Sequence, residues 1–346
     1  MAARFAPSRI SFSTANADRN RPREAAPRNV LPFKLVYHSR YNLDLGAHVF
    51  PARKYRLVRD GLVAKGIADP ADILAPDPAE DDDVLRVHTP EYVEKLKHDS
   101  LSASERMRLE LPFSPQVVEA FWLAAGGSIL AARCAMQDGF GINLGGGFHH
   151  AYPAYGEGFC MLNDVAIAIR RMQADGAAAS VMVVDTDVHQ GNGTAYIFAD
   201  DSSVFTFSIH QEKNYPAPKP PSDLDINLED GIGDEEYLGG LSRGLEKSFA
   251  RFSPELLFYL AGADPYREDQ LGGLRLTLAG LRQRDDLVFA EARRRGVPVA
   301  VTLAGGYARN TEDTVRIHMN TVLAARDCCD QGLRGSSAGR ENLPQR

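Results

Sequence analysis

The sequence of 346 residues has little cysteine, and its cysteines are not spaced for structural chemistry. The four residues Cys134, Cys160, Cys328 and Cys329 include no pair at CxxC spacing, which argues against a cysteine-based zinc site and a disulfide framework. We therefore expect reduced thiols and a cytoplasmic protein. No uninterrupted apolar run approaches the ~18 residues that a membrane-spanning helix needs, so we expect no membrane span.

Positive charge is also in short supply. Lys and Arg number 39 against 46 Asp and Glu, which gives a formal net charge of −7. Binding along a nucleic-acid backbone depends on Lys and Arg at the phosphates, so this balance argues against nucleic acid as the direct ligand. It remains compatible with a basic peptide substrate.

Apolar residues make up 44% of the chain, which is ample for the core of one large domain. We expect this domain to span residues 30–331, between a disordered leader (1–29) and a disordered polar tail (332–346). The leader is rich in Arg, Ala and Ser, as transit peptides are, but Asp18 and Glu24 interrupt that pattern.

Short β-branched runs alternate with helical stretches along this domain. The runs are typical of strands buried on both faces and lie at residues 35–37, 142–144, 181–185, 204–208, 256–261 and 299–303. Apolar residues recur at helical spacing in residues 115–137, 164–173, 235–252 and 277–295. The alternation predicts an α/β fold with a single open, mostly parallel β-sheet and helices on both faces.

Polar residues follow four of the predicted strands. These segments are 145–150 (GGGFHH), 185–193 (DTDVHQGNG), 262–265 (GADP) and 305–307 (GGY). Because open α/β sheets bind ligands outside the carboxyl ends of their strands, we expect the four segments to meet at one edge of the sheet.

Two of these segments carry metal-ligating residue types. Asp185, Asp187 and His189 stand at i, i+2 and i+4, so an extended chain would direct their side chains to one face. In isolation such a string is also typical of an Asx-turn. Zinc accepts mixed His and Asp ligands and keeps an open position in catalytic sites, so we predict a metal held by Asp187, His189 and Asp264.

The remaining residues suit acid–base chemistry. His149 and His150 follow three glycines, and imidazole changes charge near neutral pH. Asp185 and Asn192 are candidates to orient the two rings by hydrogen bonds. Tyr307 stays protonated at pH 7 and could donate to a developing oxyanion.

Taken together, these motifs resemble the zinc-dependent histone deacetylases over about residues 31–325. The matching segments are VHTPEY (87–92), GGGFHH (145–150), GFCMLND (158–164), DTDVH (185–189), GAD (262–264) and GGY (305–307). The segment HQGNG (189–193) looks most like class IV. Most other classes carry aspartate at the position of Asn192, and an amide stabilises a charged imidazole less than a carboxylate does. We therefore expect His150 to be less basic than His149.

The resemblance implies an arginase–deacetylase fold and one Zn²⁺ ion at Asp187, His189 and Asp264. It implies K⁺ bound around Asp185, Asp187, His189, Ser208 and Ile209, with a second site near Phe198, Asp201 and Val204. It also implies substrate-binding residues along an acyl-lysine tunnel at Gly158, Phe159, Tyr215, Leu271, Gly305 and Gly306. The implied activity is hydrolysis of acetyl-lysine or longer acyl-lysine in proteins, with His149, His150 and Tyr307 as the reacting side chains.

Three other functions satisfy part of the pattern. The same hydrolysis could act on acylated polyamines. Residues 240–244 (GLSRG) match the GxSxG motif of serine hydrolases, although they fall inside a predicted helix rather than a strand–turn–helix. An inactive acyl-lysine reader is the third, but every expected metal, histidine and tyrosine position is filled. Acyl-chain length, the histidine that takes the proton, the choice between Zn²⁺ and Fe²⁺ and the oligomeric state stay open at this point.

Overall fold

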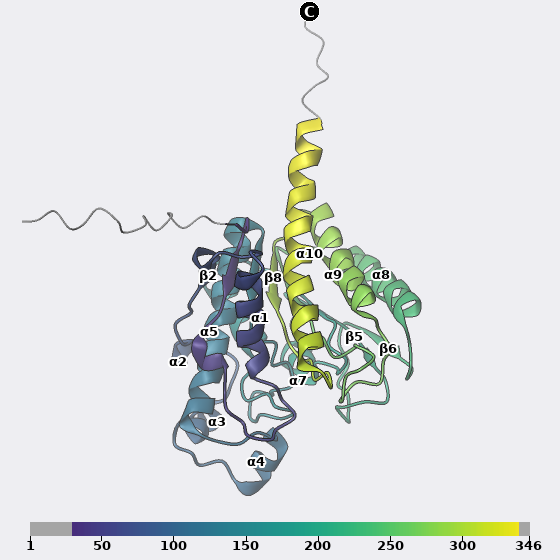
Figure 1. Ribbon diagram of the computed structural model, residues 1–346. Coiled ribbons are helices and arrows are strands. Elements are labelled where there is room, and N and C mark those ends of the chain that lie inside the picture. The colour runs from purple at the N-terminus through teal and green to yellow at the C-terminus, as the bar shows by residue number, and fades with distance from the viewer. Residues whose placement is uncertain (1–29, 339–346) are drawn as a thin grey trace, which may run out of the picture.

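Eight parallel strands form one open sheet in the computed structural model, which describes residues 30–338 (Figure 1). Their order across the sheet is β2-β1-β3-β8-β7-β4-β5-β6. The strands are β1 (Lys34–Val36), β2 (Ile73–Leu74), β3 (Phe140–Asn143), β4 (Val181–Asp185), β5 (Val204–Gln211), β6 (Leu224–Leu228), β7 (Leu256–Leu260) and β8 (Val299–Thr302). The predicted α/β fold with a single open sheet is thus confirmed, and every pairing in the sheet is parallel.

Helices cover both faces of the sheet. They are α1 (Arg53–Ala64), α2 (Asp81–Val84), α3 (Pro90–Lys97), α4 (Ala103–Leu109), α5 (Pro115–Asp138), α6 (Asp164–Ala174), α7 (Asn192–Phe198), α8 (Asp234–Arg251), α9 (Leu278–Arg294) and α10 (Thr311–Ala338), with short 3-10 turns at Ser39–Tyr41 and Pro70–Asp72. Helices α5 and α6 pack on one face, and α1, α8, α9 and α10 pack on the other. Side chains of β4 alternate between the two resulting cores: Val181 and Val183 face one, Met182 and Val184 the other.

Helix α5 corrects our expectation about long apolar segments. By length and composition alone it could cross a membrane, although 72% of its most apolar window is buried inside the protein. The helix begins where the Ser114 hydroxyl accepts the Val117 N–H at 3.2 Å, and it ends at Gly139 with φ 84°. Glu119 and Arg133 interrupt its apolar residues, and its burial is that of a core helix.

Some elements were not predicted. Strand β6 lies at the edge of the sheet and carries polar residues such as Asp225 and Asn227, so it lacks the apolar run of a central strand. Helix α10 continues to Ala338, past residue 332 at which we expected a tail to begin. The predicted leader (1–29) and the last part of the predicted tail (339–346) lie outside the described residues.

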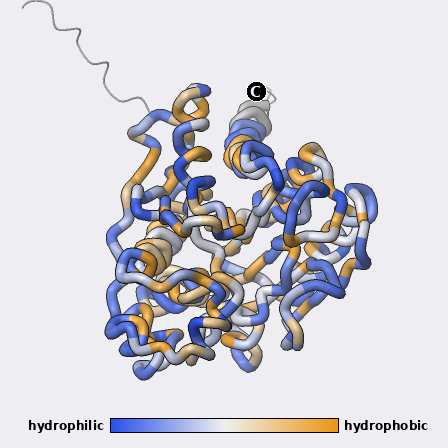
Figure 2. Tube along the Cα trace, turned by 60° about the horizontal axis from the view of Figure 1, so that its bottom comes forward, coloured by the Kyte–Doolittle hydropathy of each residue, from blue (hydrophilic) through white to orange (hydrophobic). Residues whose placement is uncertain are grey.

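The sheet determines where the polar loops meet. Strands β3, β8, β7 and β4 are neighbours, and their carboxyl ends open on the same edge. Hydrophobic stretches lie mostly within the body in Figure 2, with hydrophilic stretches on the outer helices and loops. The loops that follow these four strands therefore come together at one polar, buried place.

Candidate active site

Three potential metal ligands converge at this edge. Asp187 and His189 lie in the loop after β4, and Asp264 lies in the loop after β7. All three are buried, and one donor atom from each lies within 4.8 Å of the other two. The Nδ1 atom of His189 is 3.0 Å from Asp187 Oδ1 and 3.6 Å from Asp264 Oδ2.

These residues fit a divalent cation. Asp264 Oδ1 accepts the Val188 N–H at 2.9 Å, but Asp264 Oδ2 is buried without a hydrogen-bond partner, which is costly unless a cation meets it. A Cβ atom at Gly305 would clash with Asp264 Oδ2, so glycine is needed to leave room beside the carboxylates. Two carboxylates and one imidazole are a ligand set that zinc accepts.

The loop after β4 is bent, not extended as the i, i+2, i+4 spacing suggested. Strand β4 ends at Asp185, whose Oδ1 accepts the Asp187 N–H at 3.1 Å, and Asp187 Oδ1 accepts the His189 N–H at 3.0 Å. Two Asx-type turns thus build the site, so the turn and the metal interpretations of this segment hold together. The Asp185 side chain consequently contacts His149 and is not one of the three potential metal ligands.

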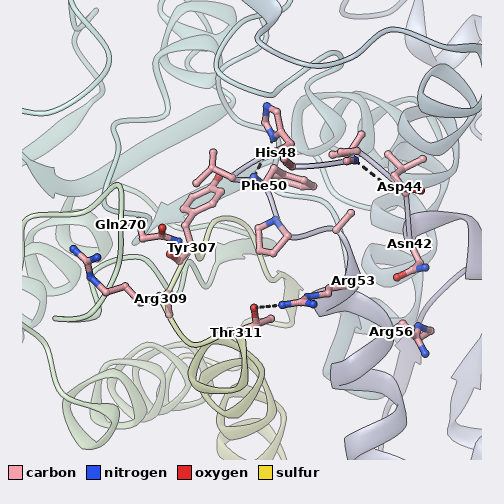
Figure 3. A pocket seen from close by; sticks show the side chains of 18 residues that line it. Asn42, Asp44, His48, Phe50, Arg53, Arg56, Gln270, Tyr307, Arg309 and Thr311 are labelled. Atoms are coloured by element: carbon pink, nitrogen blue, oxygen red, sulfur yellow. Dashed lines mark hydrogen bonds between the residues drawn. The ribbon is translucent and has the colours of Figure 1, made fainter.

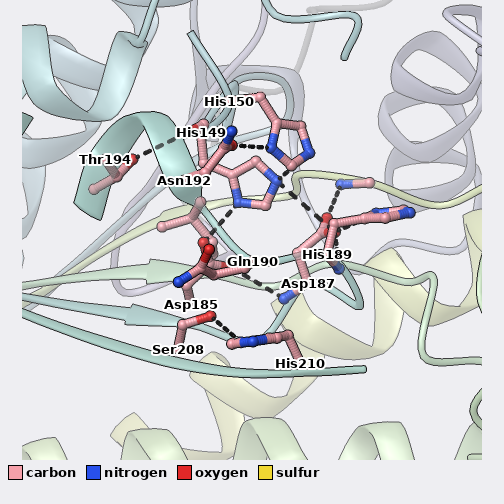
Figure 4. A network of polar contacts seen from close by, with 12 residues as sticks. His149, His150, Asp185, Asp187, His189, Gln190, Asn192, Thr194, Ser208 and His210 are labelled. Carbon is pink, nitrogen blue, oxygen red and sulfur yellow. Dashed lines mark hydrogen bonds and ion pairs between the residues drawn. The ribbon is translucent and has the colours of Figure 1, made fainter. Parts of the chain in front are cut away.

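The two adjacent histidines have different partners (Figure 4). His149 Nδ1 lies 2.6 Å from Asp185 Oδ2, and His150 Nδ1 lies 2.6 Å from Asn192 Oδ1. Their Nε2 atoms are 3.1 Å apart. Asp185 and Asn192 therefore each contact the Nδ1 atom of one of the two rings.

The pKa values of the two imidazoles depend on burial and on the charged groups around them. Burial lowers the pKa of His149, but the Asp185 and Asp187 carboxylates outweigh it and raise the pKa to about 9. Burial, together with the positive charges on His149 and His189, holds the pKa of His150 well below its usual value. The two rings are thus unequal, and His150 is the less basic, but burial and the two neighbouring histidines lower its pKa, whereas the hydrogen bond to Asn192 raises it.

Tyr307 completes the group from the loop after β8. Its backbone N–H donates to Asp269 Oδ2 at 2.7 Å, and its ring packs edge-on to Phe159 with centroids 6.1 Å apart. Burial, and then the Asp187 and Asp264 carboxylates, raise the pKa of the Tyr307 phenol well above its usual value. The phenol therefore remains a proton donor across the physiological range.

A narrow cavity of about 180 Å³ leads to these side chains. It is lined by Glu110, His150, Gly158, Phe159, His189, Asn214, Tyr215, Leu271 and Tyr307. Gly158 has φ 55°, and a Cβ there would come within 2.9 Å of the His150 and Tyr215 rings. The structure therefore brings together around one channel four residues that were expected to line a tunnel: Gly158, Phe159, Tyr215 and Leu271.

A second and larger cavity lies on the other side of Tyr307 (Figure 3). It measures about 830 Å³ and is formed by residues 42–53 together with Arg56, Gln270 and Arg309. Arg53 donates to the Thr311 hydroxyl at 2.9 Å across its wall. This cavity contacts Tyr307 but contains none of the potential metal ligands.

The other expected residues are dispersed around the site. Gly305 lines its floor, and its N–H donates to Asp187 Oδ2 at 2.9 Å, whereas Gly306 packs behind it against Ala263 and Thr314. Ser208 pairs with Asp185 across β4 and β5, with Ile209 beside it. The residues of the second expected K⁺ site lie close together along the chain: Phe198 ends α7, Asp201 lies in the following turn and Val204 begins β5.

Sequence reasoning missed several residues that hold the site in shape. Asp269 accepts the backbone N–H of Tyr307, and Asp164 accepts that of Phe148 at 2.7 Å. Lys54 is completely buried, with Nζ 2.7 Å from the Ala304 carbonyl oxygen and 5.6 Å from the Tyr307 ring centre. Only Asp164 stood inside a motif that we had singled out, so for Asp269 and Lys54 the sequence held no signal.

We compared the chain with known protein families, curated relatives and solved structures. The histone deacetylase domain family matches residues 48–322. An uncharacterized protein of Picosynechococcus sp. is 43% identical over 85% of this chain and 99% of its own length. Histone deacetylase 2 of Arabidopsis thaliana is 32% identical over 80% of this chain and 75% of its own length. Among solved structures, a histone deacetylase homolog complexed with SAHA superimposes with a TM-score of 0.74 at 23% identity, covering 88% of both chains.

Proposed function

The chain belongs to the histone deacetylase family, and we propose that it is a zinc-dependent hydrolase that removes acetyl or longer fatty acyl groups from lysine side chains of proteins. One observation carries this proposal. The buried donors of Asp187, His189 and Asp264 lie beside the histidine pair and Tyr307 at the end of a narrow channel. A channel of about 180 Å³ that ends at His150, His189 and Tyr307 suits a side chain whose reacting amide is at its tip.

The residues of the chain would divide the chemistry among them. A bound Zn²⁺ ion would polarise the acyl carbonyl and lower the pKa of a water molecule. His150 would take the proton of that water, because its neutral imidazole, bonded through Nδ1 to Asn192, keeps a lone pair on Nε2. Tyr307 would donate a hydrogen bond to the developing oxyanion, and an imidazolium would protonate the departing lysine amine.

The partners of the histidines support a division of labour. Asp185 places a full negative charge on His149, which favours its charged form and suits it as the acid. The neutral amide of Asn192 faces His150, which favours a neutral ring with a free lone pair on Nε2. We assign His150 as the proton acceptor and His149 as the proton donor.

Two further features belong to the proposal. One K⁺ ion would be held around Asp185, Asp187, His189, Ser208 and Ile209, where β4 and β5 are paired at the base of the metal loop, and a second near Phe198, Asp201 and Val204. The segment HQGNG (189–193) supports placing the chain in the class IV branch of the family.

Hydrolysis of acylated polyamines is the second candidate function. Glu110 lines the channel and is exposed to solvent. A carboxylate at that place would attract a second cationic amine of a small substrate, which favours this alternative. The serine-hydrolase alternative has no such support, because Ser242 is exposed in the middle of helix α8.

A turnover panel tests the proposal. The substrates are acetyl-, crotonyl-, octanoyl- and myristoyl-lysine peptides beside acetylputrescine, each with and without a chelator. We expect chelator-sensitive hydrolysis of at least one lysine peptide. Exclusive turnover of acetylputrescine would favour the polyamine function, and no chelator-sensitive amide hydrolysis at all would contradict both. The variant Ser242→Ala should behave like the wild type.

A further inference from the structure

Glu157 contacts Asn192, the partner of His150, but is neither a potential metal ligand nor one of the reacting side chains. Its Oε1 accepts a hydrogen bond from Asn192 Nδ2 at 2.6 Å, and Asn192 Oδ1 lies 2.6 Å from His150 Nδ1. Asn192 and His150 are only 1% and 5% exposed. A carboxylate, an amide and an imidazole thus form a chain that ends at the ring we assign as the proton acceptor.

We propose that Glu157 is a positioning residue that selects the tautomer of His150 by fixing the orientation of the Asn192 amide. This inference rests on the proposed hydrolytic function. It names a role for Glu157 within that function.

The argument starts from what each group can donate. An ionised carboxylate only accepts hydrogen bonds, so the face of Asn192 that meets Glu157 must be its NH₂ group. The amide oxygen is then turned toward His150, and an oxygen only accepts, so His150 Nδ1 must carry the proton. In the neutral ring this leaves a lone pair on Nε2, the atom that faces His149.

Without Glu157 the amide would lose its direction. An asparagine side chain turned by 180° fills the same space and would present NH₂ to His150 Nδ1. That contact requires a lone pair on Nδ1 and places the proton on Nε2, which blocks proton uptake there. The hydroxyl of Tyr152, 3.3 Å from Asn192 Nδ2, cannot prevent this, because a hydroxyl both donates and accepts.

The position of Glu157 is itself well determined. Its backbone N–H donates to the Cys160 carbonyl at 3.0 Å, and the Cys160 N–H donates back to Glu157 at 2.9 Å. Two residues further on, the Phe159 N–H donates a hydrogen bond to the Leu109 carbonyl at 3.1 Å. Within residues 30–331 no lysine, arginine or histidine forms an ion pair with Glu157, so no such cation competes with the amide for its charge.

This arrangement also explains how His150 is oriented without being charged. Asp185 contacts the His149 imidazole directly, whereas the carboxylate of Glu157 reaches His150 only through a neutral amide. Asp185 therefore both orients the His149 ring and stabilises its positive charge. Asn192 orients the His150 ring without placing a negative charge beside it.

The test is to exchange the carboxylate and the amide between positions 157 and 192. In Glu157→Gln the amide of Asn192 loses its fixed direction, and we expect kcat to fall about tenfold or more with KM close to wild type. In Asn192→Asp two carboxylates face each other, so turnover should also fall. In the double variant the carboxylate introduced at position 192 accepts from His150, and the glutamine amide introduced at position 157 donates to that carboxylate. The double variant should therefore have a higher kcat than either single variant.

A second readout requires no substrate. In zinc-loaded protein with ¹⁵N-labelled histidine, two-bond ¹H–¹⁵N spectra distinguish the two neutral tautomers, and the His150 signal is assigned by its loss in His150→Ala. We expect Nδ1–H in the wild type and in the double variant, and a population of Nε2–H in Glu157→Gln. Tyr152→Phe is the control and should leave both turnover and tautomer unchanged.

The outcomes separate the inference from the function. Three results would each overturn the role of Glu157. They are wild-type turnover in Glu157→Gln, the wild-type His150 tautomer in Glu157→Gln, and a double variant whose kcat does not exceed that of the single variants. Absence of wild-type turnover on every acyl substrate would overturn the proposed function, while the tautomer measurement would still decide the inference. Zinc content and melting temperature of each variant exclude loss of the site or the fold.

Discussion

The Nε2 atoms of His149 and His150 face each other at 3.1 Å, while a carboxylate lies against Nδ1 of the first ring and an amide against Nδ1 of the second. At this distance one ring can donate its Nε2–H to the lone pair of the other. The partner on each outer nitrogen decides which ring carries the proton in the resting site.

The charge of Asp185 should appear in the pH dependence of turnover. Burial lowers the pKa of His149, and Asp185 is the first of the groups that raise it to about 9. In Asp185→Asn that pKa must fall, so the basic limb of the kcat/KM profile should move to lower pH. An unmoved basic limb, with zinc content preserved, would contradict the assignment of His149 as the acid.

Removing the Tyr307 hydroxyl should affect turnover and not the metal. The phenol is buried and stays protonated, and the residue is not one of the three donors. Tyr307→Phe should reduce kcat by about 10²–10³-fold, the usual effect of losing one oxyanion donor, with zinc stoichiometry unchanged. Tyr37→Phe changes a half-buried tyrosine that does not line the channel, and this control should remain active. Full activity of Tyr307→Phe would remove the phenol from the mechanism.

Variants of two acidic residues, Asp264 and Asp269, should distinguish loss of the metal from loss of the position of Tyr307. Asp264→Ala removes one of three ligands and should abolish both zinc retention after dialysis and turnover. Asp269→Asn disturbs the acceptor for the Tyr307 and Leu271 N–H groups but no metal donor. It should keep zinc and lose about 10- to 100-fold in turnover. Equal zinc loss in both variants would contradict this division.

His88 should make the fold sensitive to acid. Its Nε2 accepts the Asn163 N–H at 3.0 Å, and burial lowers its pKa from 6.5 to about 4 against the opposing effect of nearby backbone groups. The unfolded chain therefore binds this proton more readily than the folded one. The stabilisation by neutral His88 is fully present above pH 6.5 and is lost as the pH falls toward 4.

This effect is measured from melting temperatures across the same pH interval. His88→Gln should be less stable than the wild type at neutral pH and should show a flatter loss of stability on acidification. His98→Gln changes an exposed histidine and should retain the wild-type slope. A parallel slope in His88→Gln would show that other groups cause the acid sensitivity.

Much of the fold could be predicted because the central strands are apolar on both faces. The runs around Val181–Asp185 and Leu256–Leu260 are fully buried, so sequence pattern and structure coincide. Strand β6 was missed because an edge strand is bounded by fewer neighbours and tolerates Asp225 and Asn227. Lys54 at the base of the site was missed because a fully buried lysine contradicts the usual burial of its residue type.

The sequence by itself determined the residue types of the site and their order along the chain. Asp187, His189 and Asp264 follow strands whose apolar runs are visible in the printed letters, and parallel strands bring such ends to one edge. Local composition suffices for this much, because strand formation and strand direction depend on short segments and their connections.

Only the tertiary structure decided which atom faces which. The contact between Glu157 and Asn192 joins residues that are 35 positions apart, and it exists because the turn at residues 157–160 docks against the start of α7. Hydrogen bonds depend on distances of tenths of an ångström and on the direction of single N–H groups, and no pattern of residue types encodes either. The tautomer that we infer for His150 is therefore a property of the folded chain.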